Sequence, residues 1–450
     1  MMIAILVFGL QLGSPQDANV GPRTQATGAQ REPADSNNEA ATQASDGSST
    51  SNVAAGLPLE LGAHLFGRYE NRQGYDRLAV SRGRFLEGDS TVYRARLVLT
   101  SAPIDLGTGL STRFRFAPQA AGFFGNLTNT TETADLGLYE GWLRLEGTSW
   151  LVDAGRLRLN YGDALVIGDL DWNQVGRSFD GLRSRLDLNS AGWIDLIVTQ
   201  VRDGIGGPGD DSFAGDIFFG GVYASLGTLI DEDLQLEPYV LSQLWGEERV
   251  NDSTAPAAAQ LTAGVRAVRD FGPVDVRLEP GIQFGQRRVE NATPDVVAYQ
   301  VDLEAGVRLA DGLRVSLEGI FASGDDPTTS DVEGWDELFP TTHKWLGLMD
   351  VIGIRTNVAS GVAHASFVSG RFKALLDAHL FWRPETATTQ RSYAGAEFNM
   401  QAIYILGHGM TIRGLYGAFV PGNDHFFNVG EGRFNADVAH YLEAQYTFRL

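Results

Sequence analysis

The sequence contains no cysteine and no hydrophobic run long enough to form a transmembrane helix. Zero cysteines among 450 residues exclude disulfide bonds and thiolate metal sites. A membrane-spanning helix needs about 18 consecutive apolar residues, and no stretch of the sequence reaches that length. Lys and Arg total 35 against 56 Asp and Glu, which gives a net charge of −21. This acidic balance argues against nucleic acid as a partner, because binding to phosphates requires a basic surface.

The first part of the chain differs in composition from the rest. Residues 3–12 form a short apolar stretch, and we interpret residues 1–13 as a secretory signal segment. Residues 14–56 are rich in Ser, Thr, Ala, Asn, Gln and Asp and cannot bury a core, so we predict a disordered N-terminal arm. From Leu57 to Leu450 the composition is uniform and no linker interrupts it, which predicts one domain over residues 57–450.

Apolar side chains alternate with polar ones along most of this domain. The last segment places Leu442, Ala444, Tyr446 and Phe448 on one face and polar residues such as Glu443 on the other. Strands of this kind expose one face to lipid and the other to water. Only a closed sheet can satisfy the backbone groups of such strands in a membrane. We therefore predict an all-β fold, a transmembrane antiparallel up-and-down β-barrel of about 18 strands.

The predicted connections alternate between short and long. Short ones fall at residues 107–108, 272 and 407–409, and long ones at residues 162–177 and 324–355. Short turns on one side and long loops on the other are typical of bacterial outer-membrane barrels. A soluble array of β-sandwiches is the alternative, but the long uniform strands show no unit of sandwich size.

Arginines recur on the polar face of five consecutive predicted strands. Adjacent strands lie about 4.8 Å apart, so these side chains can form a basic wall that lines the pore and binds anions. The predicted pore-lining residues are Arg94, Arg96, Arg113, Arg115, Arg144, Arg156, Arg158, Arg183 and Arg185. The alternative is that they pair with lumen carboxylates and make the barrel rigid, the candidates being Glu140, Glu146, Asp187, Asp302, Glu304, Glu318, Glu397 and Glu443. Both interpretations stay open at this point.

Two segments carry more information than the alternation does. Residues 155–181 read GRLRLNYGDALVIGDLDWNQVGRSFDG, and residues 338–350 read LFPTTHKWLGLMD. In order and spacing they resemble the alginate export family of outer-membrane barrels, and the resemblance extends over residues 57–450. It implies a monomeric barrel of about 18 strands that exports an acidic exopolysaccharide. The sequence departs from the family at Ala164 and Leu165, where a basic residue is usual.

The resemblance also implies roles for residues of the two segments. They are Tyr161, Asp163, Trp172, Arg177, Asp180, His343, Lys344 and Asp350. We expect both segments to fold inward or to cap the pore, fixed by an ion pair between Arg177 and Asp180 or between Lys344 and Asp350. The alternative is that Gly176, Asp180 and Gly181 only shape a turn into the next strand.

These observations favour an outer-membrane channel that passes anionic solutes by passive diffusion, with acidic exopolysaccharide or anionic saccharides as substrates. A general or oligosaccharide-specific porin unrelated to alginate is the alternative, because a fold transfers between relatives more reliably than a substrate does. A plugged structural barrel and an outer-membrane enzyme are further alternatives. The seven histidines belong to no catalytic motif, so we expect no enzyme, cofactor or metal. The expected partners are outer-membrane lipid, lipopolysaccharide, the saccharide and a periplasmic export scaffold.

Overall fold

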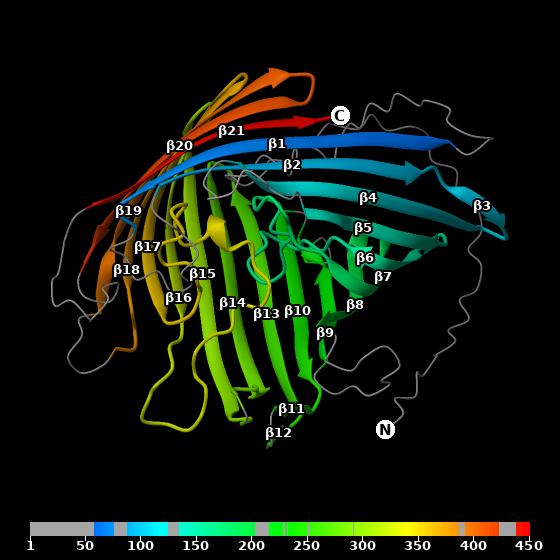
Figure 1. Ribbon diagram of the computed structural model, residues 1–450, viewed down its shortest axis with the longest axis horizontal. Helices are drawn as coiled ribbons and strands as arrows, with labels where there is room; N and C mark the ends of the chain where they lie inside the picture. Colours follow the sequence, from blue (N-terminus) through cyan, green and yellow to red (C-terminus); the bar gives the residue numbers. More distant parts are fainter. Residues whose placement is uncertain are drawn as a thin grey trace.

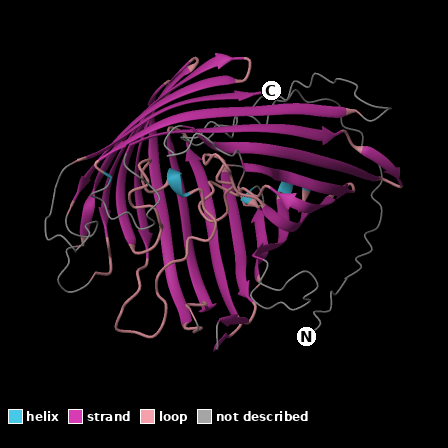
Figure 2. Ribbon diagram, in the orientation of Figure 1, coloured by secondary structure: helices cyan, strands magenta, loops and turns pink. Residues whose placement is uncertain are grey.

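The computed structural model describes residues 58–75, 88–124, 135–202, 216–227, 230–231, 233–250, 253–290, 292–386, 392–422 and 438–450. The predicted signal segment (1–13) and the predicted arm (14–56) lie outside the described residues. Figure 2 shows that the described chain is dominated by strands, with helix confined to short turns such as η3 (Asn189–Ala191) and η5 (Thr342–Lys344). No helix among the described residues is long and apolar enough to span a membrane.

The strands form one closed antiparallel sheet (Figure 1). β1 pairs with β2 on one side and with β21 on the other, which closes the barrel. The sheet contains 19 strands. β2 and β3 both pair with β4, one after the other, so together they occupy one position in the ring and the barrel has 18 strand positions. The first strands are β1 (Leu59–Gln73), β2 (Gly88–Ser101), β3 (Ile104–Gly107), β4 (Leu110–Phe124), β5 (Asp135–Glu146), β6 (Trp150–Leu157), β7 (Phe179–Asp187), β8 (Trp193–Arg202), β9 (Ile217–Ser225) and β10 (Leu234–Trp245).

The remaining strands complete the ring. They are β13 (Ala258–Phe271), β14 (Val274–Gln286), β15 (Asp295–Ala310), β16 (Leu313–Ala322), β17 (Val358–Ser369), β18 (Phe372–Trp382), β19 (Tyr393–Gly407), β20 (Met410–Pro421) and β21 (Ala439–Arg449). A separate hairpin, β11 (Glu248–Val250) with β12 (Ser253–Ala255), lies in the connection between β10 and β13. The predicted all-β barrel of about 18 strands is therefore confirmed.

The alternation of side chains explains why these segments become barrel strands. In β15, Val297 and Tyr299 are exposed on the outer face, while Ala298, Gln300 and Asp302 are buried on the inner face. Outward apolar side chains favour lipid, and the closed ladder leaves no unpaired sheet edge. The barrel therefore presents an apolar outer surface of the kind that suits a membrane.

Short and long connections lie at opposite ends of the barrel. The predicted short connections at 107–108, 272 and 407–409 are found between β3 and β4, β13 and β14, and β19 and β20. Gly272 sits in its turn at φ +74°, a conformation that favours glycine. β1 begins and β21 ends at this short-turn end, where His64 lies opposite Arg449. In an outer membrane this is the periplasmic end.

Two of the long loops fold into the lumen instead of extending outward. They are the loop between β6 and β7 (residues 158–178) and the loop between β16 and β17 (residues 323–357), which Figure 1 shows in teal and yellow inside the barrel outline. Side chains of each loop form a buried apolar cluster with side chains of the neighbouring barrel strands. One cluster includes Leu157, Tyr161, Ile167 and Phe179. The part of the lumen that holds these two loops is thus filled by protein and is not uniformly polar.

Candidate channel constriction

The two inward loops are joined to each other by their backbones. The amide of Gly168 donates to the carbonyl of Phe339 at 2.7 Å, and the amide of Phe339 donates to the carbonyl of Val166 at 3.1 Å. Nη1 of Arg177 donates to the carbonyls of Gly168 at 3.0 Å and Pro340 at 2.9 Å, so this one guanidinium bridges both loops. We call the pair of loops, residues 158–178 and 323–357, the plug.

Side chains of the two motif segments meet at the same junction. The rings of Trp172 and His343 stack with centroids 3.6 Å apart and planes at 16°. Nδ1 of His343 lies 2.9 Å from a carboxylate oxygen of Asp350. Lys344 donates from Nζ to the carbonyl of Asp163 at 3.3 Å. Residues from both segments therefore build one structure inside the barrel.

Asp171 anchors the plug to β2. Its carboxylate lies 2.8 Å from Nη1 of Arg94 and 2.9 Å from Nη2 of Arg96, and all three side chains are buried. Burial alone would raise the pKa of Asp171, but Arg94 and Arg96 outweigh it and hold the pKa below the ordinary value. The carboxylate is therefore charged at neutral pH, and the ion pair holds the plug against the wall.

A second carboxylate, Asp163, anchors the plug to the other side of the barrel. Its Oδ2 lies 2.7 Å from Nε of Arg266 on β13 and 3.8 Å from Nε of Arg277 on β14. Burial opposes ionisation, but Arg266, followed by Lys344 and Arg277, lowers the pKa of Asp163 below its ordinary value. On the other loop, Arg355 lies 2.8 Å from Asp302 on β15. The plug is thus held from several directions at once.

Eight of the nine predicted pore arginines divide into two groups. Arg94, Arg96 and Arg158 bind carboxylates of the plug, Arg158 through Asp169. Five others face the lumen on the periplasmic side of the plug and pair with carboxylates of the barrel wall. The pairs are Arg113 with Glu146, Arg115 with Glu140, Arg144 and Arg183 with Asp153, and Arg185 with Asp195. These five keep between 20% and 37% of their side-chain surface exposed. They are paired with carboxylates, as the second interpretation predicts, and they remain partly accessible to the lumen; anion binding by these arginines stays a prediction.

Arg156 does not face the lumen, which corrects the sequence interpretation. Arg144 lies opposite Asp153 in the register of β5 and β6, so Asp153 and Gly155 point inward, and Arg156 points outward with Ala154. There it lies 3.7 Å from Asp180, which is exposed on the same outer face. The prediction failed because the alternation rule places an apolar residue such as Leu157 on the lipid side, whereas Leu157 is buried inside the barrel.

The contacts of the other motif residues differ from those suggested by the sequence. Arg177 reaches backbone carbonyls, Asp180 lies beside Arg156, and Asp350 contacts His343. Tyr161 donates from its hydroxyl to Asp195 at 2.7 Å and stacks on Tyr223. Sequence reasoning missed the wall anchors Arg266 and Arg277. Their only local signal is their position on the inward face of alternating strands.

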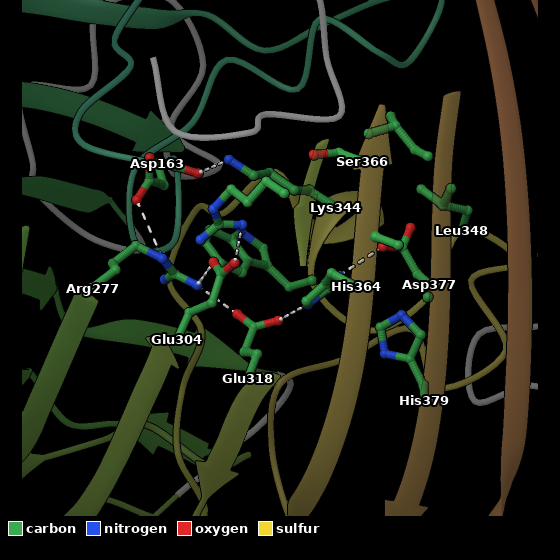
Figure 3. Close-up of a pocket in the computed structure, with 15 residues that line it drawn as sticks. Asp163, Arg277, Glu304, Glu318, Lys344, Leu348, His364, Ser366, Asp377 and His379 are labelled. Atoms are coloured by element: carbon green, nitrogen blue, oxygen red, sulfur yellow. Dashed lines mark hydrogen bonds and ion pairs between the residues drawn. The ribbon is translucent and has the colours of Figure 1, made fainter. Parts of the chain in front are cut away.

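A polar cavity lies beside the plug on the periplasmic side (Figure 3). Figure 3 shows Asp163 and Lys344 of the plug at one side of the cavity. On the barrel wall, interacting side chains follow one another from strand to strand in the order Arg277, Glu318, His364 and Asp377. Nε2 of His364 lies 3.0 Å from Glu318, and its Nδ1 lies 2.6 Å from Asp377. Cations and carboxylates alternate here, so the lining is polar without one dominant sign.

A closed barrel with an apolar outer band and loops folded into its lumen defines an outer-membrane β-barrel of the porin type, located in a bacterial outer membrane. The alginate export family model matches residues 130–425, which include both motif segments. The chain therefore belongs to the alginate export family. A search of curated proteins found no match.

Solved structures show the same fold at low identity. OccK5 (OpdH) from Pseudomonas aeruginosa has 12% identity and a TM-score of 0.58, over 87% of this chain and 98% of that one. OpdK from the same organism, solved with vanillate, has 11% identity and a TM-score of 0.59, over 87% and 98%. OccAB3 from Acinetobacter baumannii has 10% identity and a TM-score of 0.59, over 87% and 99%. Family and fold together indicate a channel rather than an enzyme.

Proposed function

We propose that the chain is a passive channel for anionic saccharides, with acidic exopolysaccharide as the first candidate. The observation that carries this proposal is the wall formed by Arg113, Arg115, Arg144, Arg183 and Arg185, whose guanidinium groups stay partly exposed below the plug. Arginine remains charged at any physiological pH and presents a planar fork that matches a carboxylate. A row of such groups attracts carboxylates and passes them along.

A porin for oligosaccharides or small organic anions is the second candidate. The plug joins across the lumen through the bridge between Ile167 and Phe339, and this narrows the path for a polymer. A related barrel was solved with vanillate, a small carboxylate. In both candidates the arginine wall selects the anion, and the plug limits its size.

Ion selectivity in a planar bilayer tests the role of the wall. Wild type should conduct and prefer chloride over potassium. Arg144→Gln with Arg183→Gln leaves Asp153 without either partner, so the anion preference should fall sharply or reverse. Arg156→Gln is the matched control, since it makes the same exchange on the outer face. Wild type that conducts nothing, or a double variant with unchanged reversal potential, would contradict the proposal.

A further inference from the structure

A row of polar side chains lies on the inner faces of β18 and β19. His379 on β18 stands directly opposite Glu397 on β19. Asn399 and Gln401 follow Glu397 at every second position and therefore share its face. The four side chains are 4%, 2%, 0% and 1% exposed, in that order. We call these four residues the polar strip.

The strip carries hydrogen-bonding atoms that the described part of the chain does not use. Nδ1 of His379, Oε2 of Glu397, Oδ1 of Asn399 and both polar side-chain atoms of Gln401 have no hydrogen-bond partner among the described residues. Buried polar atoms are normally satisfied, so a run of them on one face requires an explanation. Two strands away, by contrast, the carboxylate of Glu443 is paired with Arg413 at the same barrel wall.

A segment of the plug covers the strip. The amide of Met349 donates to Oε1 of Glu397 at 2.9 Å. The side chain of Met349 fills the hollow at Gly417, where an added Cβ would lie 2.6 Å from Met349 Cγ and 3.1 Å from Asn399 Oδ1. Methionine is unbranched and flexible. Its side chain therefore covers Asn399 without a covalent or charged link to the barrel wall.

The strip adjoins the cavity on the periplasmic side of the plug. His379 itself lines the cavity, together with Gly347, Leu348 and Leu375. Leu375 lies opposite Gln401 in the register. Figure 3 shows His379 and Leu348 at one edge of the cavity, away from the Asp163 and Lys344 edge. A solute in the cavity therefore reaches the strip as soon as the covering segment shifts.

We propose that the polar strip binds sugar hydroxyl groups of a saccharide that passes through the barrel. Amide, carboxylate and imidazole groups together supply both the donors and the acceptors that hydroxyls require. This inference rests on the proposed function and deepens it. The arginines on β4, β5 and β7 bind the carboxylates of an acidic saccharide, and the strip, across the lumen on β18 and β19, binds its hydroxyls. A simple anion such as chloride uses only the arginine wall.

The test uses three probes in planar bilayers: chloride, neutral maltotriose and acidic trigalacturonate, with the sugars added on the periplasmic side. Binding is measured from current interruptions. Asn399→Leu with Gln401→Leu should weaken the binding of both trisaccharides about tenfold, because each lost hydrogen bond accounts for about a threefold to tenfold change. Chloride conductance should stay unchanged. Gln235→Leu, the same exchange at an inward position of β10 outside the strip, is the control.

Each outcome separates the strip from the arginine wall. A wild type that conducts nothing defeats the proposed function itself. Anion-selective conductance with equal trisaccharide binding in wild type and double variant overturns the strip alone. A loss of chloride conductance in step with trisaccharide binding, or an equal loss in the control, also overturns it, because the strip would then only shape the pore. If the double variant does not assemble, Gln401→Met keeps the side-chain volume and should weaken both trisaccharides about threefold.

Discussion

Two sets of arginines in the same barrel differ in where their carboxylate partners lie. Arg144 and Arg183 pair with Asp153, which belongs to the wall itself. Arg94 and Arg96 pair with Asp171, which belongs to the plug. Wall-to-wall pairs fix the shape of the pore and leave the guanidinium groups accessible. Wall-to-plug pairs are fully buried and hold the plug against the barrel wall. The same residue type therefore leaves accessible charge in the lumen in one region and anchors an inward loop in the other.

The largest effect should come from Asp171→Ala. This change leaves Arg94 and Arg96 buried without their carboxylate, and breaking a buried pair in this way costs about 3–5 kcal/mol. The plug should leave the wall of β2, so single-channel conductance should rise severalfold in planar bilayers. Asp180→Ala removes an exposed carboxylate from the outer face and is the control. Unchanged conductance in Asp171→Ala would show that the plug does not obstruct the path.

Gly347→Ala should have the next largest effect. Gly347 adopts φ +85°, and an added Cβ would meet the carboxylate of Glu397. Backbone strain of this kind costs about 1–3 kcal/mol, and the contact pushes the plug segment off β19. Conductance should rise less than in Asp171→Ala, with more frequent open events. Gly370→Ala has positive φ in an open turn between β17 and β18, so it controls for strain alone. The same change in both variants would contradict the assignment.

Tyr75→Phe should have a smaller effect. The Tyr75 hydroxyl donates to the carbonyl of Met349 at 3.0 Å, and both residues are buried. Loss of one such hydrogen bond costs about 1 kcal/mol. The open probability of the channel should rise by about fivefold, while the unfolding midpoint in urea changes little. Tyr404→Phe, on the outer face of β19, is the matched control. A larger fall in the unfolding midpoint than in the control would mean that Tyr75 supports the barrel and not the plug.

The sequence predicted the barrel and the plug better than it predicted the contacts between them. Alternation placed Arg94 and Arg96 inside correctly, because their neighbour Leu97 faces lipid. The same rule failed at Arg156, where apolar Leu157 packs on the plug rather than on lipid. The motif segments pointed to Asp163 and His343, but the partner of Asp163, Arg266, lies 103 residues away. No local pattern encodes such a pairing, since it depends on how a loop returns into a closed ring.

Acidification from pH 7 to pH 5 should have the smallest effect on the anchored plug. The two anchoring carboxylates that belong to the plug itself, Asp163 and Asp171, have a pKa below the ordinary value of about 3.9 because adjacent arginines outweigh the effect of burial. A depressed pKa contributes stability that is fully present above the unfolded-state pKa and is lost only as the pH falls through the lower folded-state pKa. Conductance should therefore stay constant to pH 5 and rise only below about pH 4. Asp171→Asn removes the charge of one anchoring carboxylate, so its conductance should already be raised at pH 7. Acidification should then cause no further rise in conductance through this residue. A wild-type plug that opened between pH 7 and pH 5 would contradict the view that the Asp163 and Asp171 pairs dominate over the third anchor, the pair between Arg355 and Asp302.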